Sequence, residues 1–257
     1  MTSSAAPDGS KAFGGHAALY AKRRPQYPAS VFAALLSALQ GERAHAVDLG
    51  AGTGQATRAL SKLFRHVTAV EPDLRMAAEI PAIENVKIVN ETAEAATFSA
   101  GSVDAVVAAT SFHWMKQREV AETVYRWLRP GGVFFPFRYG AFEISGAAKP
   151  VFDRHAALWE PYKDRRLTAN IEYMKPVQST GLYSSVTSFS DEIGANLSPQ
   201  DAAGFLGTTS FASAYARANY DDPDEYIRKL GDEFSACGDE ARLRAPLKGV
   251  IAVKGAS

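Results

Sequence analysis

Asp48-Leu49-Gly50-Ala51-Gly52-Thr53-Gly54 lies where a short apolar run meets a stretch of helical periodicity. The run at residues 44–49 predicts a strand, and apolar residues recur at helical spacing through residues 55–64. Glycines at such a turn let the backbone approach a ligand closely, and the first turn of a helix offers free N–H groups. The stretch therefore predicts a strand, a ligand-binding turn and a helix, in that order.

The same alternation continues on the C-terminal side of this turn. The pattern predicts one helix from about Asp73 and another over residues 119–128, which ends at Arg129-Pro130-Gly131-Gly132. Strands that alternate with helices require right-handed crossovers, and they therefore predict a mainly parallel sheet covered on both faces. Short apolar runs place these further strands at residues 66–71, 85–90, 103–109 and 133–138.

After Gly140 the pattern changes to aromatic-rich helical stretches between two later strands. These helices are too many for a simple connection, so we expect them to form a cap over the carboxyl edge of the sheet. The fold class expected is α/β, a Rossmann-like doubly wound sheet of seven mostly parallel strands with helices on both faces and a helical cap. The helices are predicted at residues 151–162, 198–206, 208–219 and 224–234, and the strands at 183–190 and 249–254.

The composition excludes several classes of protein. The chain has 257 residues and a formal net charge of zero, with 28 Lys and Arg against 28 Asp and Glu, so we expect no nucleic-acid partner and no membrane partner. The single cysteine, Cys237, excludes an intrachain disulfide, and no His, Asp or Glu cluster has metal-ligand spacing. No apolar run approaches the ~20 residues of a spanning helix. The first ten residues lack the pattern of a signal peptide, and we expect a soluble, cytoplasmic protein.

Two carboxylates near the glycine turn indicate the kind of ligand. Glu71 ends the second predicted strand, where a carboxylate can accept hydrogen bonds from both hydroxyls of a ribose. The dinucleotide fingerprint requires a third glycine where Gln55 stands, so a pyrophosphate fits this turn poorly. Asp48 could reach an ammonium group directly or through water. The residues therefore favour a nucleoside with a positively charged amino-acid part, and an NAD(P)-dependent oxidoreductase stays as the alternative.

The order and spacing of four stretches resemble the motifs of class I S-adenosylmethionine-dependent methyltransferases. A fifth stretch, YAKRRPQYP at residues 20–28, and SFHWM at 111–115 are similar to the small-molecule subgroup that includes trans-aconitate methyltransferase. Residues 197–220 resemble the cap of that subgroup, with Thr209-Ser210 in place of its usual Trp-Ser pair. The four stretches are VDLGAGTGQATRAL at residues 47–60, VEPDLRM at 70–76, VDAVVAATSFHWM at 103–115 and WLRPGGVFFPF at 127–137.

The resemblance implies a division of the chain and a set of cofactor contacts. Residues 1–43 would be an N-terminal segment and helix over the cofactor, residues 44–140 the cofactor-binding core, and residues 141–257 the remaining strands of the same domain with inserted substrate-cap helices. Glu71 would hold the ribose hydroxyls, and Arg24 would pair with the cofactor carboxylate through its planar fork. The implied contacts with S-adenosylmethionine are Tyr20, Arg24, Asp48, Gly50, Ala51, Gly52, Gly54, Glu71, Pro72, Thr92, Ala93, Glu94, Ala109 and Thr110.

The acceptor end of the site is less specific in the sequence. His113 follows the fourth predicted strand, and it could act as a general base, contact the substrate or cofactor, or only pack against Trp114. Arg138 could attract an acidic substrate or be a solvated charge, and Trp114 and Tyr139 could form walls of the substrate pocket. Aromatic residues at helical spacing in the cap are typical of packing, with one or two facing the substrate; they are Phe205, Phe211, Tyr215 and Tyr220.

The function expected is transfer of a methyl group from S-adenosylmethionine to an oxygen, nitrogen or carbon of a small molecule by in-line displacement, with S-adenosylhomocysteine as product. The methyl of a sulfonium is already electrophilic, so alignment and exclusion of water are the main requirements, and no protein nucleophile is needed. A protein that binds S-adenosylmethionine without catalysis is a further alternative. The sequence leaves the acceptor and the oligomeric state open.

Overall fold

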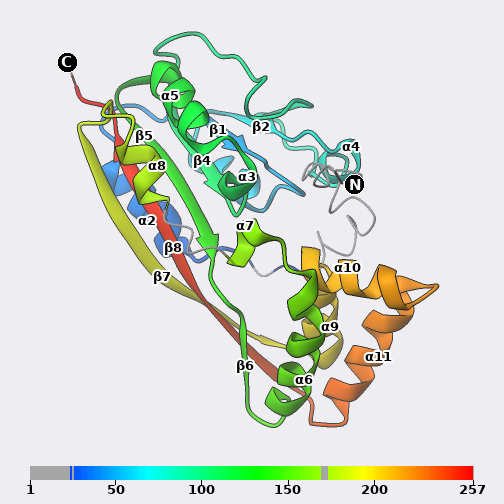
Figure 1. Cartoon of the computed structure of the whole chain (residues 1–257). Helices are drawn as coiled ribbons and strands as arrows, with labels where there is room; N and C mark the ends of the chain where they lie inside the picture. The colour runs from blue at the N-terminus through cyan, green and yellow to red at the C-terminus, as the bar shows by residue number, and fades with distance from the viewer. Residues whose placement is uncertain (1–23, 25, 169–172, 257) are drawn as a thin grey trace, which may run out of the picture.

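The computed structural model describes residue 24, residues 26–168 and residues 173–256. Within these residues, eight strands form one sheet in the order β3-β2-β1-β4-β5-β8-β6, and β7 pairs with the other edge of β8 (Figure 1). The strands are β1 (His45–Leu49), β2 (His66–Val70), β3 (Val86–Val89), β4 (Val103–Ala109), β5 (Leu128–Tyr139), β6 (Glu143–Ser145), β7 (Ser185–Leu197) and β8 (Ala241–Val253).

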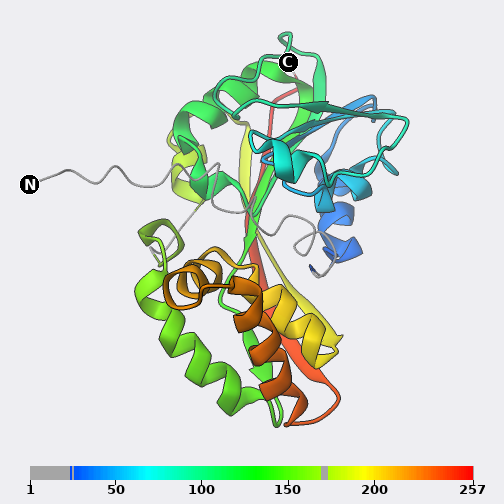
Figure 2. The same cartoon turned by 90° about the vertical axis from the view of Figure 1, so that its right-hand side faces the viewer.

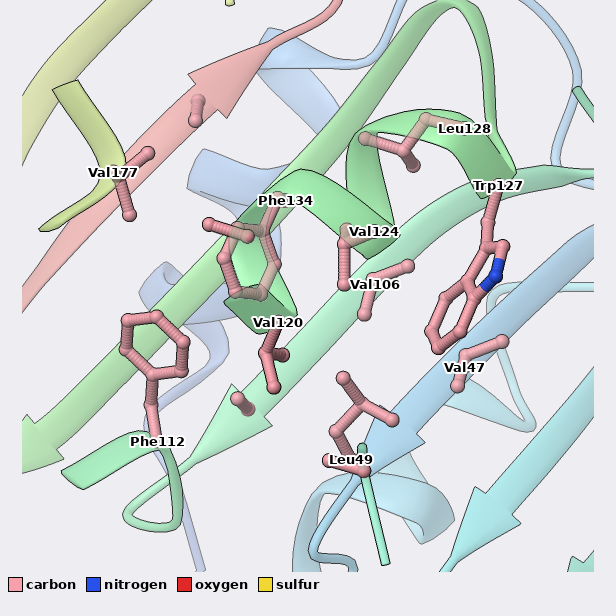
Figure 3. Close-up of a cluster of buried hydrophobic side chains, with 14 of the residues drawn as sticks. Val47, Leu49, Val106, Phe112, Val120, Val124, Trp127, Leu128, Phe134 and Val177 are labelled. Carbon is pink, nitrogen blue, oxygen red and sulfur yellow. The ribbon is translucent and has the colours of Figure 1, made fainter. Parts of the chain in front are cut away.

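The strands from β3 to β5 are parallel, and they are covered on both faces. On one face α5 (Gln117–Trp127) and α8 (Met174–Gln178) pack on the sheet, and Val124 and Trp127 contact Val47 and Leu49 (Figure 3). On the other face α2 (Ala29–Ala38) and α3 (Gln55–Leu60) cover the sheet. Each such apolar side chain contributes roughly 1.5–3 kcal/mol when buried. This double burial explains why the strands are nearly continuous apolar runs.

The antiparallel part of the sheet is longer than the sequence predicts. β8 pairs with β7 along 13 residues, from Leu197 opposite Ala241 to Ser185 opposite Val253. Its first half also pairs with β6 and its second half with β5. Buried and exposed residues alternate along its first half, which is the pattern of a strand with one solvated face. The sequence predicts seven strands because this alternation and the three residues of β6 are weak signals beside the apolar run at 249–254.

The cap surrounds a core of its own beyond the carboxyl ends of the parallel strands (Figures 1 and 2). Trp159, Phe205 and Tyr226 are buried in it and pack with Ile144 of β6 and Leu243 of β8. The predicted helix at 151–162 is an α-helix continued by a 3₁₀ turn. The remaining helices are α4 (Leu74–Ala77), α6 (Lys149–Trp159), α7 (Arg165–Thr168), α9 (Pro199–Gly207), α10 (Ser210–Asn219) and α11 (Pro223–Ser235), with 3₁₀ turns at Phe112–Trp114 and Glu160–Tyr162.

Candidate active site

A cavity of about 630 Å³ lies between the sheet and the cap. Its wall from the sheet comes from the glycine turn after β1, the ends of β2, β4 and β5, and the loop after β3. Its wall from the cap comes from α6, residues 160–167 and the junction of α9 and α10. The carboxyl ends of parallel strands are the usual place for ligands in open α/β sheets.

The glycine turn has a backbone conformation that requires glycine. Gly50, Gly52 and Gly54 have φ values of 66°, 58° and 83°. The N–H groups of Gly50 and Ala51 both donate to the carbonyl of Val70, at 2.8 and 3.0 Å, and so attach the turn to β2. A Cβ on Gly52 would have one neighbouring atom within 4 Å, on a methionine that also lines the cavity, so a side chain there would enter the cavity. The turn thus keeps space for a ligand.

Glu71 presents a fixed carboxylate to this space. Its side chain lines the cavity and is 7% exposed. Its Oε2 accepts a hydrogen bond from the N–H of Gly52 at 2.8 Å, and its Oε1 accepts one from the N–H of Asp73 at 2.9 Å. Burial raises the pKa of Glu71, and these two backbone hydrogen bonds act in the opposite direction. Each oxygen keeps a lone pair, so the carboxylate can also accept from two ligand hydroxyls.

Asp48 lies behind the turn and does not line the cavity. Its side chain is completely buried, and its Oδ2 accepts a hydrogen bond from the Thr57 hydroxyl at 2.6 Å. Its Oδ1 has no hydrogen-bond partner. Burial is the main reason that the pKa of Asp48 is raised to about 6. The structure therefore gives Asp48 no direct contact with a ligand in the cavity, and Gly54, which packs against Ile80, has none either.

The end of β4 is held in an unusual conformation. Thr110 has a φ of 57°, which is rare for a β-branched residue and occurs most often at functional sites. Its N–H donates to the carbonyl of Phe137 at 2.7 Å, and its hydroxyl lies 3.1 Å from that of Tyr27. The hydroxyl of Ser111 donates to the carbonyl of Leu49 at 2.6 Å. These contacts tie the end of β4 to β1, to β5 and to the segment before α2.

His113 is buried at the centre of the cavity wall. Its Nδ1 is hydrogen bonded to the hydroxyl of Tyr173 at 2.9 Å. Burial is the main reason that the pKa of His113 is lowered to about 3, and the positive charges of Arg138 and Arg166 act in the same direction. The imidazole is therefore neutral near pH 7. Trp114 next to it lies under the guanidinium of Arg166, which is 4.4 Å from the ring centroid.

Most of the residues implied by the resemblance gather at this cavity. His113, Trp114, Arg138 and Tyr139 all line it. Asp48 and Gly54 do not, and Tyr20 lies outside the described residues. The predicted cofactor contacts that line the cavity are Arg24, Gly50, Ala51, Gly52, Glu71, Pro72, Thr92, Ala93, Glu94, Ala109 and Thr110.

Several lining residues have no signal in the sequence. Of the four aromatic residues expected on cap helices, Phe211 lines the cavity, whereas Phe205, Tyr215 and Tyr220 do not. Tyr27 belongs to the YAKRRPQYP stretch, so the resemblance could have indicated it. Gln55, Met76, Ser111 and Met115 also fall within the stretches that carry the resemblance. Phe142, Phe152 and Trp159 lie on helices or loops whose docking the sequence does not specify. The further lining residues include Gln55, Met76, Ser111, Met115, Phe142, Phe152 and Trp159.

In the described part of the chain no three His, Cys, Asp or Glu side chains lie close enough together to hold a metal ion. Nor does any described helix have the length and apolar character needed to cross a membrane. The site is instead a turn of backbone N–H groups, a carboxylate and an enclosed cavity. These features fit the sugar and amino-acid parts of a nucleoside ligand, and they define a nucleoside-binding α/β protein.

Comparison with known proteins gives the class. Residues 47–135 match a family model described as a methyltransferase domain. A protein of Dictyostelium discoideum named as a methyltransferase is 27% identical over 214 residues, which are 82% of this chain and 81% of that protein. A solved structure from Anaeromyxobacter dehalogenans, described as a type II methyltransferase, has a TM-score of 0.69 at 25% identity and covers 91% of this chain and 98% of its own.

A phosphoethanolamine N-methyltransferase of Haemonchus contortus, solved with S-adenosylhomocysteine, shares the fold. Its TM-score is 0.54 at 15% identity, over 94% of this chain and 57% of that one. Residues 47–135 are therefore a methyltransferase domain, and with the relatives and the site they indicate an S-adenosylmethionine-dependent methyltransferase. The matched methyltransferase domain implies S-adenosylmethionine as the cofactor, and the oxidoreductase alternative is thereby set aside.

Proposed function

We propose that the enzyme methylates a small organic molecule held between the sheet and the cap. The observation that carries this proposal is the cavity of about 630 Å³ that runs from the glycine turn to the cap helices. Cavities of roughly 300–1,000 Å³ are typical of small-molecule sites. The formal net charge of zero also disfavours an enzyme that methylates nucleic acids, because such an enzyme usually carries an excess of basic residues.

In this proposal the sheet end of the cavity holds the methyl donor. Bound S-adenosylmethionine supplies an electrophilic methyl group on a sulfonium. Glu71 would accept hydrogen bonds from the ribose hydroxyls, and the turn at Gly50–Gly52 would lie along the amino-acid part of the cofactor. The remaining task of the protein is to orient the acceptor and to exclude water, and orientation alone contributes up to ~7–11 kcal/mol in favourable reactions. The cap provides both.

The acceptor that suits the neighbouring side chains best is a carboxylate. A carboxylate oxygen is already ionised at pH 7 and needs no base, whereas His113, with a pKa lowered to about 3, is a weak base. Arg138 lines the cavity and uses Nε and Nη2 to donate to the carbonyls of Tyr139 and Leu167, which leaves Nη1 for an acidic ligand. In this arrangement His113 orients the acceptor through a hydrogen bond.

Membership of the small-molecule subgroup that includes trans-aconitate methyltransferase is part of this proposal. The stretches at residues 20–28 and 111–115 support it. The pair Thr209-Ser210, which replaces the usual Trp-Ser of that subgroup, lines the cavity. The acceptor of this enzyme would therefore differ from the acceptors of its relatives in shape.

The test has a binding arm and a turnover arm. Calorimetry should give micromolar binding of S-adenosylmethionine and no binding of NADH. A panel of small acids, phenols and heterocycles is then incubated with a methyl-labelled donor and analysed by mass spectrometry. We expect the label in a methyl ester of one of the acids. Label found only in phenols or amines would contradict the carboxylate acceptor, and label in none of the three classes would contradict a small-molecule acceptor.

A further inference from the structure

The cap end of the cavity is an aromatic corner formed by Phe152, Trp159 and Phe211. The ring centroid of Trp159 lies 6.1 Å from that of Phe152 and 5.9 Å from that of Phe211. Phe152 and Trp159 come from α6, and Phe211 comes from α10. Three rings in contact at one end of a cavity make a surface that fits a flat apolar group.

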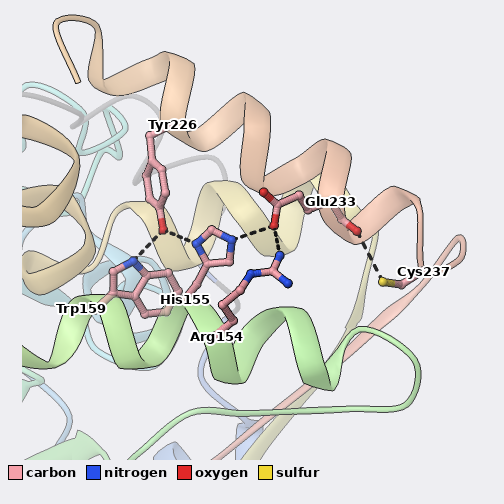
Figure 4. A network of polar contacts seen from close by, with 6 residues as sticks. All are labelled: Arg154, His155, Trp159, Tyr226, Glu233 and Cys237. Carbon is pink, nitrogen blue, oxygen red and sulfur yellow. Dashed lines mark hydrogen bonds and ion pairs between the residues drawn. The ribbon is translucent and has the colours of Figure 1, made fainter. Parts of the chain in front are cut away.

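The polar edge of Trp159 is engaged away from this corner. Its Nε1–H donates to the hydroxyl of Tyr226 at 2.7 Å. The same hydroxyl is hydrogen bonded to Nδ1 of His155 at 2.8 Å, and Nε2 of His155 lies 2.9 Å from Oε2 of Glu233. Figure 4 shows the chain of contacts from α6 to α11, with Arg154 paired with Glu233 at its outer end.

The directions of these hydrogen bonds follow from the groups themselves. An indole N–H can only donate, so the Tyr226 oxygen accepts from Trp159. Burial raises the pKa of Tyr226, so its hydroxyl stays protonated and donates to Nδ1 of His155. Because Nδ1 of His155 accepts from Tyr226, Nε2 is the nitrogen that donates to Glu233. This order of donors and acceptors holds the indole N–H of Trp159 toward Tyr226.

We propose that this aromatic corner binds a flat, unsaturated part of the acceptor, and that Tyr226, His155 and Glu233 are positioning residues that hold Trp159 in place for it. The inference rests on the proposed function, because it assigns a chemical class to the acceptor of that same site. The acceptor would then be an aromatic or conjugated acid, with its carboxylate near Arg138 and its apolar body against the aromatic corner, whose base is the buried Trp159.

The test measures binding to the enzyme loaded with S-adenosylhomocysteine, so it does not depend on turnover. The probes are trans-cinnamate and hexanoate, which share a carboxylate but differ in having a flat ring. By calorimetry we expect the native enzyme to bind cinnamate at least ~10-fold more tightly than hexanoate, since aromatic contacts strengthen binding beyond simple burial. Equal binding of the two probes, or no binding of cinnamate to loaded enzyme, would overturn the inference.

Variants test the positioning role separately. Tyr226→Phe keeps the aromatic ring but removes the hydroxyl that hydrogen bonds to Trp159 and His155. We expect the binding of cinnamate to weaken ~5-fold and the binding of hexanoate to stay unchanged. In Trp159→Phe enzyme, which has no indole N–H, adding Tyr226→Phe should change cinnamate binding by less than about 2-fold, because coupled residues are non-additive. Equal effects of Tyr226→Phe in both backgrounds would overturn the positioning role.

The matched control is Tyr220→Phe, because the ring of Tyr220 packs 5.2 Å from that of Tyr226 but takes no part in the hydrogen bonds that link Trp159, Tyr226, His155 and Glu233. It should leave the binding of both probes unchanged. If Tyr226→Phe does not fold, Glu233→Ala takes its place in the same comparison, because it removes the hydrogen-bond acceptor of His155 at the partly exposed end of the network. Failure of the native enzyme to bind S-adenosylhomocysteine would instead contradict the proposed function, so the two failures are distinguishable.

Discussion

The two ends of the cavity are built in different ways. At the sheet end, one turn of seven residues and Glu71 place backbone N–H groups and a carboxylate. At the cap end, the wall comes from side chains on α6, α9 and α10, which are far apart in the sequence. A site made by local backbone geometry leaves a motif, whereas a site made by helix packing leaves only apolar residues at helical spacing. The wall at the glycine turn could therefore be predicted from the sequence, and the wall at the cap could not.

The largest effect expected at the donor end is that of Gly50→Ala. Its Cβ would lie 2.6 Å from the Cβ of Ser111, at a φ of 66°. We expect a loss of about 4 kcal/mol in the free energy of unfolding, from roughly 1–2 kcal/mol of left-handed strain and about 1–3 kcal/mol of overpacking. Urea unfolding measures this loss.

Gly101→Ala is the matched control. Gly101 has a φ of 64°, and a Cβ there would have no neighbour within 4 Å. We expect Gly101→Ala to lower the free energy of unfolding only by the left-handed strain, about 1–2 kcal/mol. Equal losses in the two variants would show that the close approach of the turn to Ser111 is unimportant.

Removing the carboxylate of Glu71 should weaken cofactor binding strongly. Two charge-assisted hydrogen bonds of about 1.5 kcal/mol each would be lost, which corresponds to a rise of ~100-fold in the Kd of S-adenosylmethionine. Calorimetry on Glu71→Ala measures the change, and the exposed Glu84 provides a control variant, Glu84→Ala, with unchanged binding. A rise of less than ~3-fold in Glu71→Ala would contradict the ribose contact.

Asp48 should make the stability of the free enzyme depend on pH. Burial raises its pKa from 3.8 to about 6, so the folded state keeps the proton to a higher pH than the unfolded state. Stability contributed by this group is therefore present below about pH 4 and is lost as the pH rises through 6, by up to about 3 kcal/mol. Asp48→Asn keeps an acceptor for Thr57 and should lack this fall.

Thermal unfolding of the native enzyme and of Asp48→Asn between pH 4 and pH 8 measures this pH dependence. The variant should be the more stable protein at pH 7.5, and the two should converge near pH 4. Parallel curves over the whole range would mean that Asp48 is not the group that titrates.

The smallest effect expected concerns His113. Because its pKa is lowered to about 3, it stays neutral from pH 5 to pH 8 and should add no limb to the pH profile of kcat. His113→Gln should raise the KM for the acceptor ~10-fold, the loss of one hydrogen bond, with kcat within ~3-fold. A fall of kcat by ~100-fold together with the loss of a limb near pH 6.5 would identify His113 as a general base.

The sequence was sufficient for the parallel core because its strands are buried on both faces and read as apolar runs. It was less informative about side-chain direction. Asp48 is one residue from Leu49, but in β1 the two point to opposite faces of the sheet, and Asp48 meets Thr57 of α3. Its acidic type and its place before the glycine turn indicated a ligand contact that the geometry does not give.

The cap shows a different limit. Phe205 and Phe211 have the same residue type on neighbouring helices, yet Phe205 is fully buried in the cap core and Phe211 lines the cavity. The difference arises from how α9 and α10 dock on α6 and α11, which depends on contacts remote in the sequence. The Tyr226, His155 and Glu233 chain has no motif for the same reason.

The continuous pairing of β7 with β8 has a mechanical consequence. Thirteen residue pairs run without interruption from the parallel sheet into the cap, so a hinge between the two would have to break hydrogen bonds of this ladder. We therefore expect the cap to move relative to the sheet by twisting of this paired ribbon, and not by rotation about a flexible linker.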